Sequence, residues 1–329
     1  MEPSEARRMA RILRQLGGVA LALSLAGAGT WLGMGVSATE GALAQEVAPS
    51  SVEHVQRGHN GRIVFVSDRT GSYDIYSSLP SGKGVQRLTN DSEIQLDPSW
   101  SANHNKIVYT QCCSNGDFDI YTMNANGSGQ TRLTTRVGAD VEPSYSRSGK
   151  IAFSGARNGQ YDIFVMNGDG SNLHPITANQ SDDLEPTWSP NGKRIALSST
   201  RSGHGDIYTM SPTGKNLTRS TSSAGIDKQP AWSPSGKSIV FSSLREQNPK
   251  IYVTSAGRGG KDRRITSGPG PDTDPAWSPD GKHIVYAHGA GGHKGKGFDL
   301  YITSPRGGRP HRITDDVKSF EIKPDWARR

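Results

Sequence analysis

The sequence has few of the residues and motifs on which catalysis usually depends. Its 329 residues include only two cysteines and nine histidines. The histidines show no metal-ligand spacing, and two cysteines alone do not make a structural zinc site. There is no Gly-x-Ser-x-Gly nucleophile elbow, no His-Glu-x-x-His and no EF-hand loop. Of the usual catalytic arrangements, only a Ser-His-Asp set assembled from distant segments is left open.

Long apolar runs and a strong charge imbalance are also missing after the first 44 residues. No later stretch is long enough to cross a membrane, so we expect no membrane span once a leader is removed. The formal net charge is +7, of which the first 44 residues carry +1. This modest surplus, with no long basic run, permits weak attraction to anionic envelope surfaces. It does not favour a nucleic-acid partner, because the aromatic residues belong to the repeat described below.

Residues 1–44 have the pattern of an export signal. Four arginines between residues 7 and 14 precede an apolar run rich in Gly and Ala over 16–36, and a small-x-small cleavage pattern ends at Ala44. The alternative is an uncleaved membrane anchor, since the run is about long enough to span a bilayer. The cleavage pattern favours removal and predicts a periplasmic or secreted protein. Residues 45–60 are polar without periodicity, and we expect a linker there.

What the chain does contain is one phrase, Pro-x-Trp, repeated six times. The repeated prolines are separated by 45, 43, 44, 45 and 49 residues, and they are Pro98, Pro143, Pro186, Pro230, Pro275 and Pro324. The second residue after each proline is aromatic: Trp100, Tyr145, Trp188, Trp232, Trp277 and Trp326. A period in the low forties is typical of a propeller or a solenoid.

Each unit reads as four short antiparallel strands. Proline fits the first residue of a strand, and the Ser-Pro-x-Gly-Lys that follows, as in 189–193, is a tight-turn pattern. Apolar residues then alternate, as in Ile195 and Leu197, and again in Asp-Ile-Tyr-x-Met at 206–210. A last strand ends in Leu-Thr or Ile-Thr. Four strands in about 40 residues match one propeller blade.

The two ends of the repeat predict how the ring closes. The first unit, 62–89, lacks a Pro-x-Trp strand, and the last phrase has no strands after it. Residues 320–327 should therefore complete the first blade and remove the exposed sheet edges. The fold prediction is all-β: a six-bladed β-propeller over residues 61–327, closed by its C-terminal strand.

The residue before each repeated proline is the main candidate for a site. The first strand of a blade is innermost, so these residues should surround one mouth of the central channel. They are Asp97, Glu142, Glu185, Gln229, Asp274 and Lys323. Four carboxylates there could bind a cation such as calcium, a basic segment of a partner or a ligand amine. The structural alternative is that each acid accepts hydrogen bonds from nearby turn amides, with Lys323 paired to a neighbouring acid.

Arginine and aspartate recur together in the hairpins. Arg69, Arg157, Arg201 and Arg245 follow the second strand of their units, and Asp74, Asp162 and Asp206 come five residues later in three of them. The simpler interpretation is an Arg-Asp pair that braces each hairpin. In the fifth blade Lys250 replaces the aspartate, so we expect no brace there.

Cys112 and Cys113 are adjacent, and an exported chain permits disulfides. Disulfide geometry disfavours neighbouring cysteines, so thiols are expected, with a strained ring or a link between chains as the alternatives.

The phrase Asp-Pro-x-Trp-Ser-Pro-Asp-Gly-Lys-x-Ile at 274–284, with Asp-Ile-Tyr-x-Met and Leu-Thr, resembles the repeats of the TolB family, the WD40-like or PD40 propeller repeats. The resemblance covers about residues 61–327. It implies a periplasmic six-bladed propeller that binds the peptidoglycan-associated lipoprotein over the channel mouth. TolB proteins also carry an α/β domain before the propeller, where this chain has its leader and linker.

These patterns and the resemblance together favour an exported, non-catalytic propeller. It would be a monomer that binds an envelope protein or peptide, with no nucleic acid and no cofactor other than a channel-bound cation. The alternative is a small-molecule enzyme, a lyase or hydrolase, at the channel. A bound metal or a strongly shifted carboxylate there would favour the enzyme.

Overall fold

The computed structural model describes residues 61–112, 117–157, 159–257, 260–289, 297–315 and 319–327. The predicted leader (1–44), the predicted linker (45–60) and Cys113 lie outside these residues. Within them, no helix is long and apolar enough to cross a membrane.

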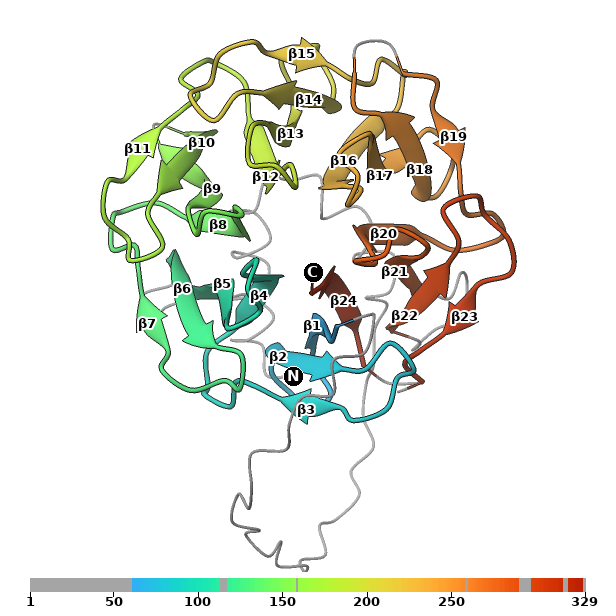
Figure 1. Cartoon of the computed structure of the whole chain (residues 1–329), viewed down its shortest axis with the longest axis horizontal. Helices are drawn as coiled ribbons and strands as arrows, with labels where there is room; N and C mark the ends of the chain where they lie inside the picture. The colour runs from blue at the N-terminus through green and yellow to red at the C-terminus, as the bar shows by residue number, and fades with distance from the viewer. Residues whose placement is uncertain are drawn as a thin grey trace, which may run out of the picture. The chain divides into compact units, whose positions relative to one another are not determined.

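The described residues form six four-stranded antiparallel sheets arranged around a central channel (Figure 1). Blade 1 contains β24 (Glu321–Trp326), β1 (Ile63–Ser67), β2 (Asp74–Ser78) and β3 (Gln86–Arg87), and blade 2 contains β4 (Gln95–Trp100), β5 (Lys106–Cys112), β6 (Phe118–Asn124) and β7 (Thr131–Arg132). Blade 3 contains β8 (Asp140–Tyr145), β9 (Ile151–Arg157), β10 (Gln160–Met166) and β11 (His174–Pro175), and blade 4 contains β12 (Asp183–Trp188), β13 (Ile195–Ser199), β14 (Asp206–Met210) and β15 (Thr218–Arg219). Blade 5 contains β16 (Ile226–Trp232), β17 (Ser238–Leu244), β18 (Lys250–Ser255) and β19 (Arg263–Arg264), and blade 6 contains β20 (Asp272–Trp277), β21 (Ile284–Gly289), β22 (Phe298–Thr303) and β23 (His311–Arg312).

The predicted closure of the ring is confirmed. Strand β24 pairs antiparallel with β1, and Ile63 lies opposite Trp326. Blade 1 is therefore built from both ends of the repeat region, and β24 lies innermost in it (Figure 1). This pairing covers the edge that β1 would otherwise expose.

The repeated tryptophans hold neighbouring blades together. Trp326 is 1% exposed and packs with Val285 of blade 6 and Phe65 of blade 1. Trp232 is equally buried, against Ile207 of blade 4 and Phe241 of its own blade. A large aromatic side chain contributes to the apolar packing between one blade and the next.

The antiparallel order places the connections of each blade on two opposite faces. We call the turn face the side on which the first strand of a blade connects to the second and the third strand connects to the fourth. We call loop face the side with the remaining connections. The two turns of blade 2 are joined by a hydrogen bond from Ala125 N–H to Asn105 O (2.9 Å). On the loop face, Thr200 N–H donates to Asp182 O (3.0 Å).

Candidate functional site

Each innermost strand carries a β-bulge at the residue before the repeated proline. In β4 the pairing with β5 shifts register between Leu96 and Ser99, and β8, β12, β16 and β20 shift at the equivalent place. The bulged residue has a positive φ in all six blades: Asp97 (50°), Glu142 (56°), Glu185 (57°), Gln229 (57°), Asp274 (52°) and Lys323 (53°). A left-handed conformation costs a non-glycine residue about 1–2 kcal/mol. It persists only where the surrounding structure holds it.

The bulges direct these six side chains, which we call the channel ring, into one cavity. The cavity has a volume of about 490 Å³, and every member of the ring lines it. Pro190, Pro234 and Pro279 of the turns line it as well, so the cavity opens on the turn face. The structure thus brings together all six residues that the sequence placed at a channel mouth.

The ring is also a hydrogen-bonded relay from blade to blade. Glu142 Oε2 accepts from Glu185 N–H (2.9 Å), and Glu185 Oε2 accepts from Gln229 N–H (2.6 Å). Gln229 Oε1 accepts in turn from Asp274 N–H (3.0 Å). The backbone partner is the bulge amide of the next blade, not a nearby turn amide as the structural alternative predicted. The relay runs from blade 3 to blade 6 and holds the strained bulges at Glu185, Gln229 and Asp274.

Lys323 sits among the acids of the ring, as expected. Its Nζ lies 3.3 Å from Asp97 Oδ1 and 3.4 Å from Asp274 Oδ1. Burial alone would lower the pKa of the ammonium group, but Asp97, Asp274, Glu142 and Glu185 raise it well above its usual value. Lys323 is therefore a fixed positive charge on one side of the channel.

Glu142 and Glu185 lie on the side of the ring away from this charge. Burial, followed by the nearby Glu185 carboxylate, raises the pKa of Glu142 to about 7, and Lys323 only partly opposes the shift. Ser154 Oγ–H donates to Glu142 Oε2 (3.0 Å). This part of the cavity is short of positive charge and favours a cationic group. Over the described residues, no group of three or more His, Cys, Asp or Glu is arranged to hold a metal ion.

A second set of acids, which sequence reasoning missed, lies three residues before each repeated proline. Each is at most 1% exposed; they are Asp140, Asp183, Asp227, Asp272 and Glu321, with Gln95 in blade 2. The hairpin arginines bind these acids: Arg201 Nη2 lies 2.7 and 2.8 Å from the two carboxylate oxygens of Asp183. The guanidinium also lies over the Tyr208 ring, 5.2 Å from its centre.

The predicted Arg-Asp brace within each hairpin is therefore wrong. Arg69 pairs with Glu321 (2.8 Å), Arg157 with Asp140 (2.8 Å) and Arg245 with Asp227 (2.9 Å). The constant three-residue offset of these acids from the proline was the signal in the sequence. Each pair fastens the hairpin to the innermost strand of its blade, at the loop-face end.

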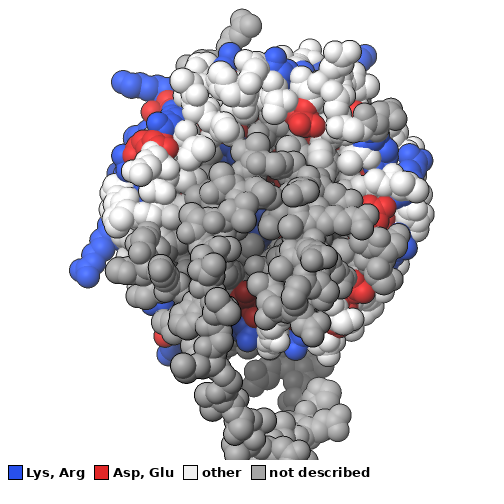
Figure 2. Space-filling model, turned by 180° about the vertical axis from the view of Figure 1, so that it is seen from behind, with Lys and Arg blue, Asp and Glu red and all other residues white. Residues whose placement is uncertain are grey.

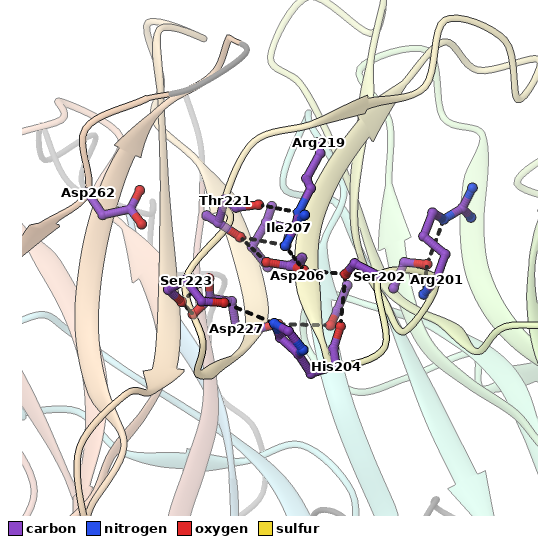
Figure 3. Close-up of polar contacts among 12 residues, drawn as sticks. Arg201, Ser202, His204, Asp206, Ile207, Arg219, Thr221, Ser223, Asp227 and Asp262 are labelled. Atoms are coloured by element: carbon purple, nitrogen blue, oxygen red, sulfur yellow. Dashed lines mark hydrogen bonds and ion pairs between the residues drawn. The ribbon is translucent and has the colours of Figure 1, made fainter.

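The aspartates that were assigned to the brace form a separate clamp with the last strand. Figure 3 shows it in blade 4, where Arg219 and Thr221 converge on Asp206. Arg219 Nη2 lies 2.7 Å from Asp206 Oδ2, and Thr221 Oγ1 accepts from Ile207 N–H (2.9 Å). Asp206 is fully buried. The clamp is a structural feature that ties the third strand to the fourth.

Blade 6 uses different side chains for the same task. Asp272 accepts from Lys250 Nζ of blade 5 (3.1 Å) and contacts His288 Nδ1 (2.6 Å). Lys250 is 2% exposed. Lys250 was expected to leave blade 5 without its brace. Instead it links blade 5 to blade 6, while Arg245 keeps its acid.

Cys112 ends β5 and is buried. Its neighbour Cys113 is outside the described residues, so the expectation of two thiols stays a prediction.

The fold and the channel ring define the described part of the chain as a six-bladed β-propeller with a polar channel. Residues 179–300 and 222–329 match the family of the TolB beta propeller domain, PD40. The resemblance drawn from the repeats is thereby confirmed. A 49-residue stretch is 41% identical to the Tol-Pal system protein TolB of Desulfosudis oleivorans, covering 15% of this chain and 11% of that protein.

Two solved structures have the same fold. TolB from Acinetobacter baumannii superposes with a TM-score of 0.71 at 22% identity, over 82% of this chain and 67% of that one. Hydrazine synthase of Kuenenia stuttgartiensis superposes with a TM-score of 0.69 at 18% identity, over 82% of this chain and 47% of that one. The fold is thus shared with an enzyme and does not decide the function.

Proposed function

We propose that this protein is exported to the cell envelope and binds a protein or peptide partner at the mouth of its channel, without catalysing a reaction. The observation that carries the proposal is the channel ring, in which four carboxylates from four blades face one cavity that opens on the turn face. The family match to TolB supports an envelope role. A peptidoglycan-associated lipoprotein is the candidate partner, and the protein acts as a periplasmic or secreted monomer.

The partner would contribute a basic group to the ring. Lys323 already pairs with Asp97 and Asp274, whereas no salt bridge to Glu142 or Glu185 occurs among the described residues, and these two carboxylates repel one another. A lysine or arginine side chain of the partner would relieve this repulsion. Because Lys323 already supplies the channel with a cation, we propose that no calcium ion or other cofactor is resident there.

The second candidate is a small-molecule enzyme, a lyase or hydrolase. The observation that favours it is Glu142, whose pKa of about 7 suits a general acid or base near neutral pH. Against it, Glu142 Oε2 already accepts two hydrogen bonds that hold the ring.

Crosslinking in the native envelope, with captured proteins identified by mass spectrometry, tests the proposal. The test variant is Glu142→Gln with Glu185→Gln. An amide keeps the acceptor for the next blade, as Gln229 does naturally, but removes the charge. The matched control is Glu93→Gln with Glu246→Gln, which makes the same change on the loop face.

We expect one envelope protein to be captured by the parent and the control, and at least tenfold less by the test variant, since a desolvated charge pair is worth 2 kcal/mol or more, roughly. Equal capture by all three proteins, or none by any, would contradict the proposal. The second outcome would direct attention to small molecules.

A further inference from the structure

The described turns of the turn face are strongly basic. They contain three acids, Asp169, Asp262 and Asp280. They contain eleven basic residues: Lys83, Arg147, Lys150, Lys193, Arg194, Lys215, Lys237, Lys261, Lys282, Arg306 and Arg309. The excess comes from the repeat itself, because the Gly-Lys that ends the turn after the Pro-x-Trp strand recurs in blades 3 to 6.

The described connections of the loop face have the opposite balance. Their acids are Asp68, Asp91, Glu93, Asp117, Asp182, Glu246 and Asp315. Their basic residues are Arg69, Arg136, Arg201 and Arg245, of which all but Arg136 bind a buried acid. Figure 2 shows one face of the molecule, where Lys and Arg side chains and Asp and Glu side chains are both visible near the edge. The described charge is thus distributed by face.

The lysines of the turn face are available for contact. Lys150, Lys193, Lys237 and Lys282 are exposed, and none has a salt bridge within the described residues. They lie in the first turns of blades 3, 4, 5 and 6, one to each of these blades. Arg194 differs, because its guanidinium donates to Ala256 O (2.8 Å) and to Thr209. The exposed basic side chains without a salt bridge among the described residues thus include these lysines together with Arg147, Arg306 and Arg309.

This composition fits a diffuse anionic layer better than a protein or a nucleic acid. Protein interfaces are depleted in lysine and depend on aromatic and arginine anchors. Among the described residues, the large exposed apolar side chains of the turn face are Leu79, Val85 and Leu217, and none is aromatic. Single-stranded nucleic acid needs aromatic stacking platforms. Distributed lysines and arginines without an exposed aromatic anchor suit phospholipid headgroups, which attract each nearby lysine or arginine by about 1 kcal/mol.

We propose that the turn face docks on the surface of a bilayer that contains anionic phospholipid, through its lysines and without insertion. The turn face would lie toward the membrane, so membrane docking and the binding of a partner at the channel mouth would be alternative states of the protein. This inference does not rest on the proposed function, because it involves the turn lysines and not the channel ring.

The test is co-sedimentation of the full chain with phosphatidylcholine vesicles, with and without phosphatidylglycerol. The variant is Lys150→Gln, Lys193→Gln, Lys237→Gln and Lys282→Gln, which lowers the net charge by four. The control on the loop face is Thr135→Glu, Arg136→Glu and Val137→Glu. These changes lower the net charge by one, two and one, which again makes four. These three residues are exposed. A Lys→Arg version of the test variant keeps the charge.

The parent should bind the phosphatidylglycerol vesicles and be released in about 1 M salt, where the Debye length is about 3 Å. The Lys→Gln variant should bind at least about tenfold more weakly, since each lysine contributes roughly fivefold. The control and the Lys→Arg variant should bind like the parent. Residues 1–60 are the same in every protein, so their contribution cancels.

Binding that ignores phosphatidylglycerol would overturn the proposal, and an acidic protein surface would then be the occupant to test. Equal weakening of the turn-face variant and the loop-face control would also overturn it. In that case net charge, to which Lys294 and Lys296 outside the described residues contribute, would account for binding. Failure here leaves the crosslinking result unaffected, because the channel ring is unchanged in all these variants.

Discussion

At the scale of the residue, the channel ring combines a strained backbone with a charge that depends on pH. The repeat itself contains both versions of the position, since Glu142 and Glu185 are acids and Gln229 is their amide. The φ angles of the three residues agree within one degree. The side-chain oxygen of each accepts a hydrogen bond from the backbone N–H of the ring residue in the next blade. The amide therefore fits the geometry, and only the charge differs.

Glu142→Gln should change how stability depends on pH. The folded protein raises the pKa of this carboxyl from 4.5 to about 7, so it binds the proton more tightly than the unfolded chain does. The free energy of unfolding therefore falls as pH rises from about 4.5 to 7 and levels off above. Removing the carboxyl should abolish this fall, which amounts to roughly 3 kcal/mol. Urea unfolding of parent and variant at several pH values measures it.

Burial raises the pKa of Asp140 to about 6. This residue is present in both proteins, so its effect on the pH dependence of stability cancels when the two are compared. The reverse change, Gln229→Glu, is the control. It places a carboxylate beside Asp274 and should make the fall with pH steeper. If the parent and Glu142→Gln have parallel profiles between pH 4.5 and 7, the assigned pKa of Glu142 is wrong.

At the scale of the element, the blades are held by buried acids at two places. One is the pair of hairpin arginine and innermost-strand acid, and the other is the clamp on the third strand. Blade 2 shows that the first can be replaced, because Gln95 occupies the acid position there. A neutral, hydrogen-bonded group at this site is thus compatible with the fold, whereas a buried charge without its partner is not.

Arg201→Gln should destabilise the protein, because it leaves the fully buried Asp183 without its cation. The expected loss is roughly 2–4 kcal/mol, since Arg201 is partly open to solvent. The double variant Asp183→Asn with Arg201→Gln should recover at least half of it. The midpoint of urea unfolding, with an unchanged slope, is the measurement. A double variant no more stable than the single one would show that the buried charge is not the cause.

The sequence was informative about the elements and less so about what connects them. The Pro-x-Trp period predicted six blades, the strand order and the position of the channel ring, because each depends on local turn and strand patterns. The bulge was not predicted. A positive φ is usually indicated by glycine, and a residue before a proline, such as Asp97 or Lys323, normally has an extended backbone. The Arg-Asp assignment failed because it chose the acid nearest in sequence. Arg69 and Glu321 are 252 residues apart, and only closure of the ring brings them together.

At the scale of the whole molecule, stability depends on one junction that differs from the others. Blade 1 is completed by β24, and the hydrogen bond from Ala327 N–H to Arg62 O (3.1 Å) joins the two ends of the described propeller. In every other blade the four strands follow one another in the chain. Loss of contacts at this junction can open the ring without unfolding a complete blade.

Trp326→Ala and Trp232→Ala form a matched pair for this junction, because both residues are 1% exposed and occupy the same place in the repeat. Each should cost about 3–5 kcal/mol through the cavity it leaves. Only Trp326→Ala should strongly increase hydrogen exchange of the amides that pair β1 with β24. Trp232→Ala should affect β16 and its neighbours. Equal exchange of β1 in the two variants would contradict a special role for the closing strand.

The closing strand also sets the order in which the molecule can assemble. Blades 2 to 6 each use contacts within about 40 residues, and such short loops close quickly at little entropic cost. The hydrogen bond between Ser67 and Glu321 spans 254 residues and has to wait until β24 has been synthesised. A nascent chain therefore passes through an open arc, whose β1 edge has its backbone groups unpaired. During that interval the open arc can aggregate or bind a chaperone, and the pairing of β24 with β1 ends the risk.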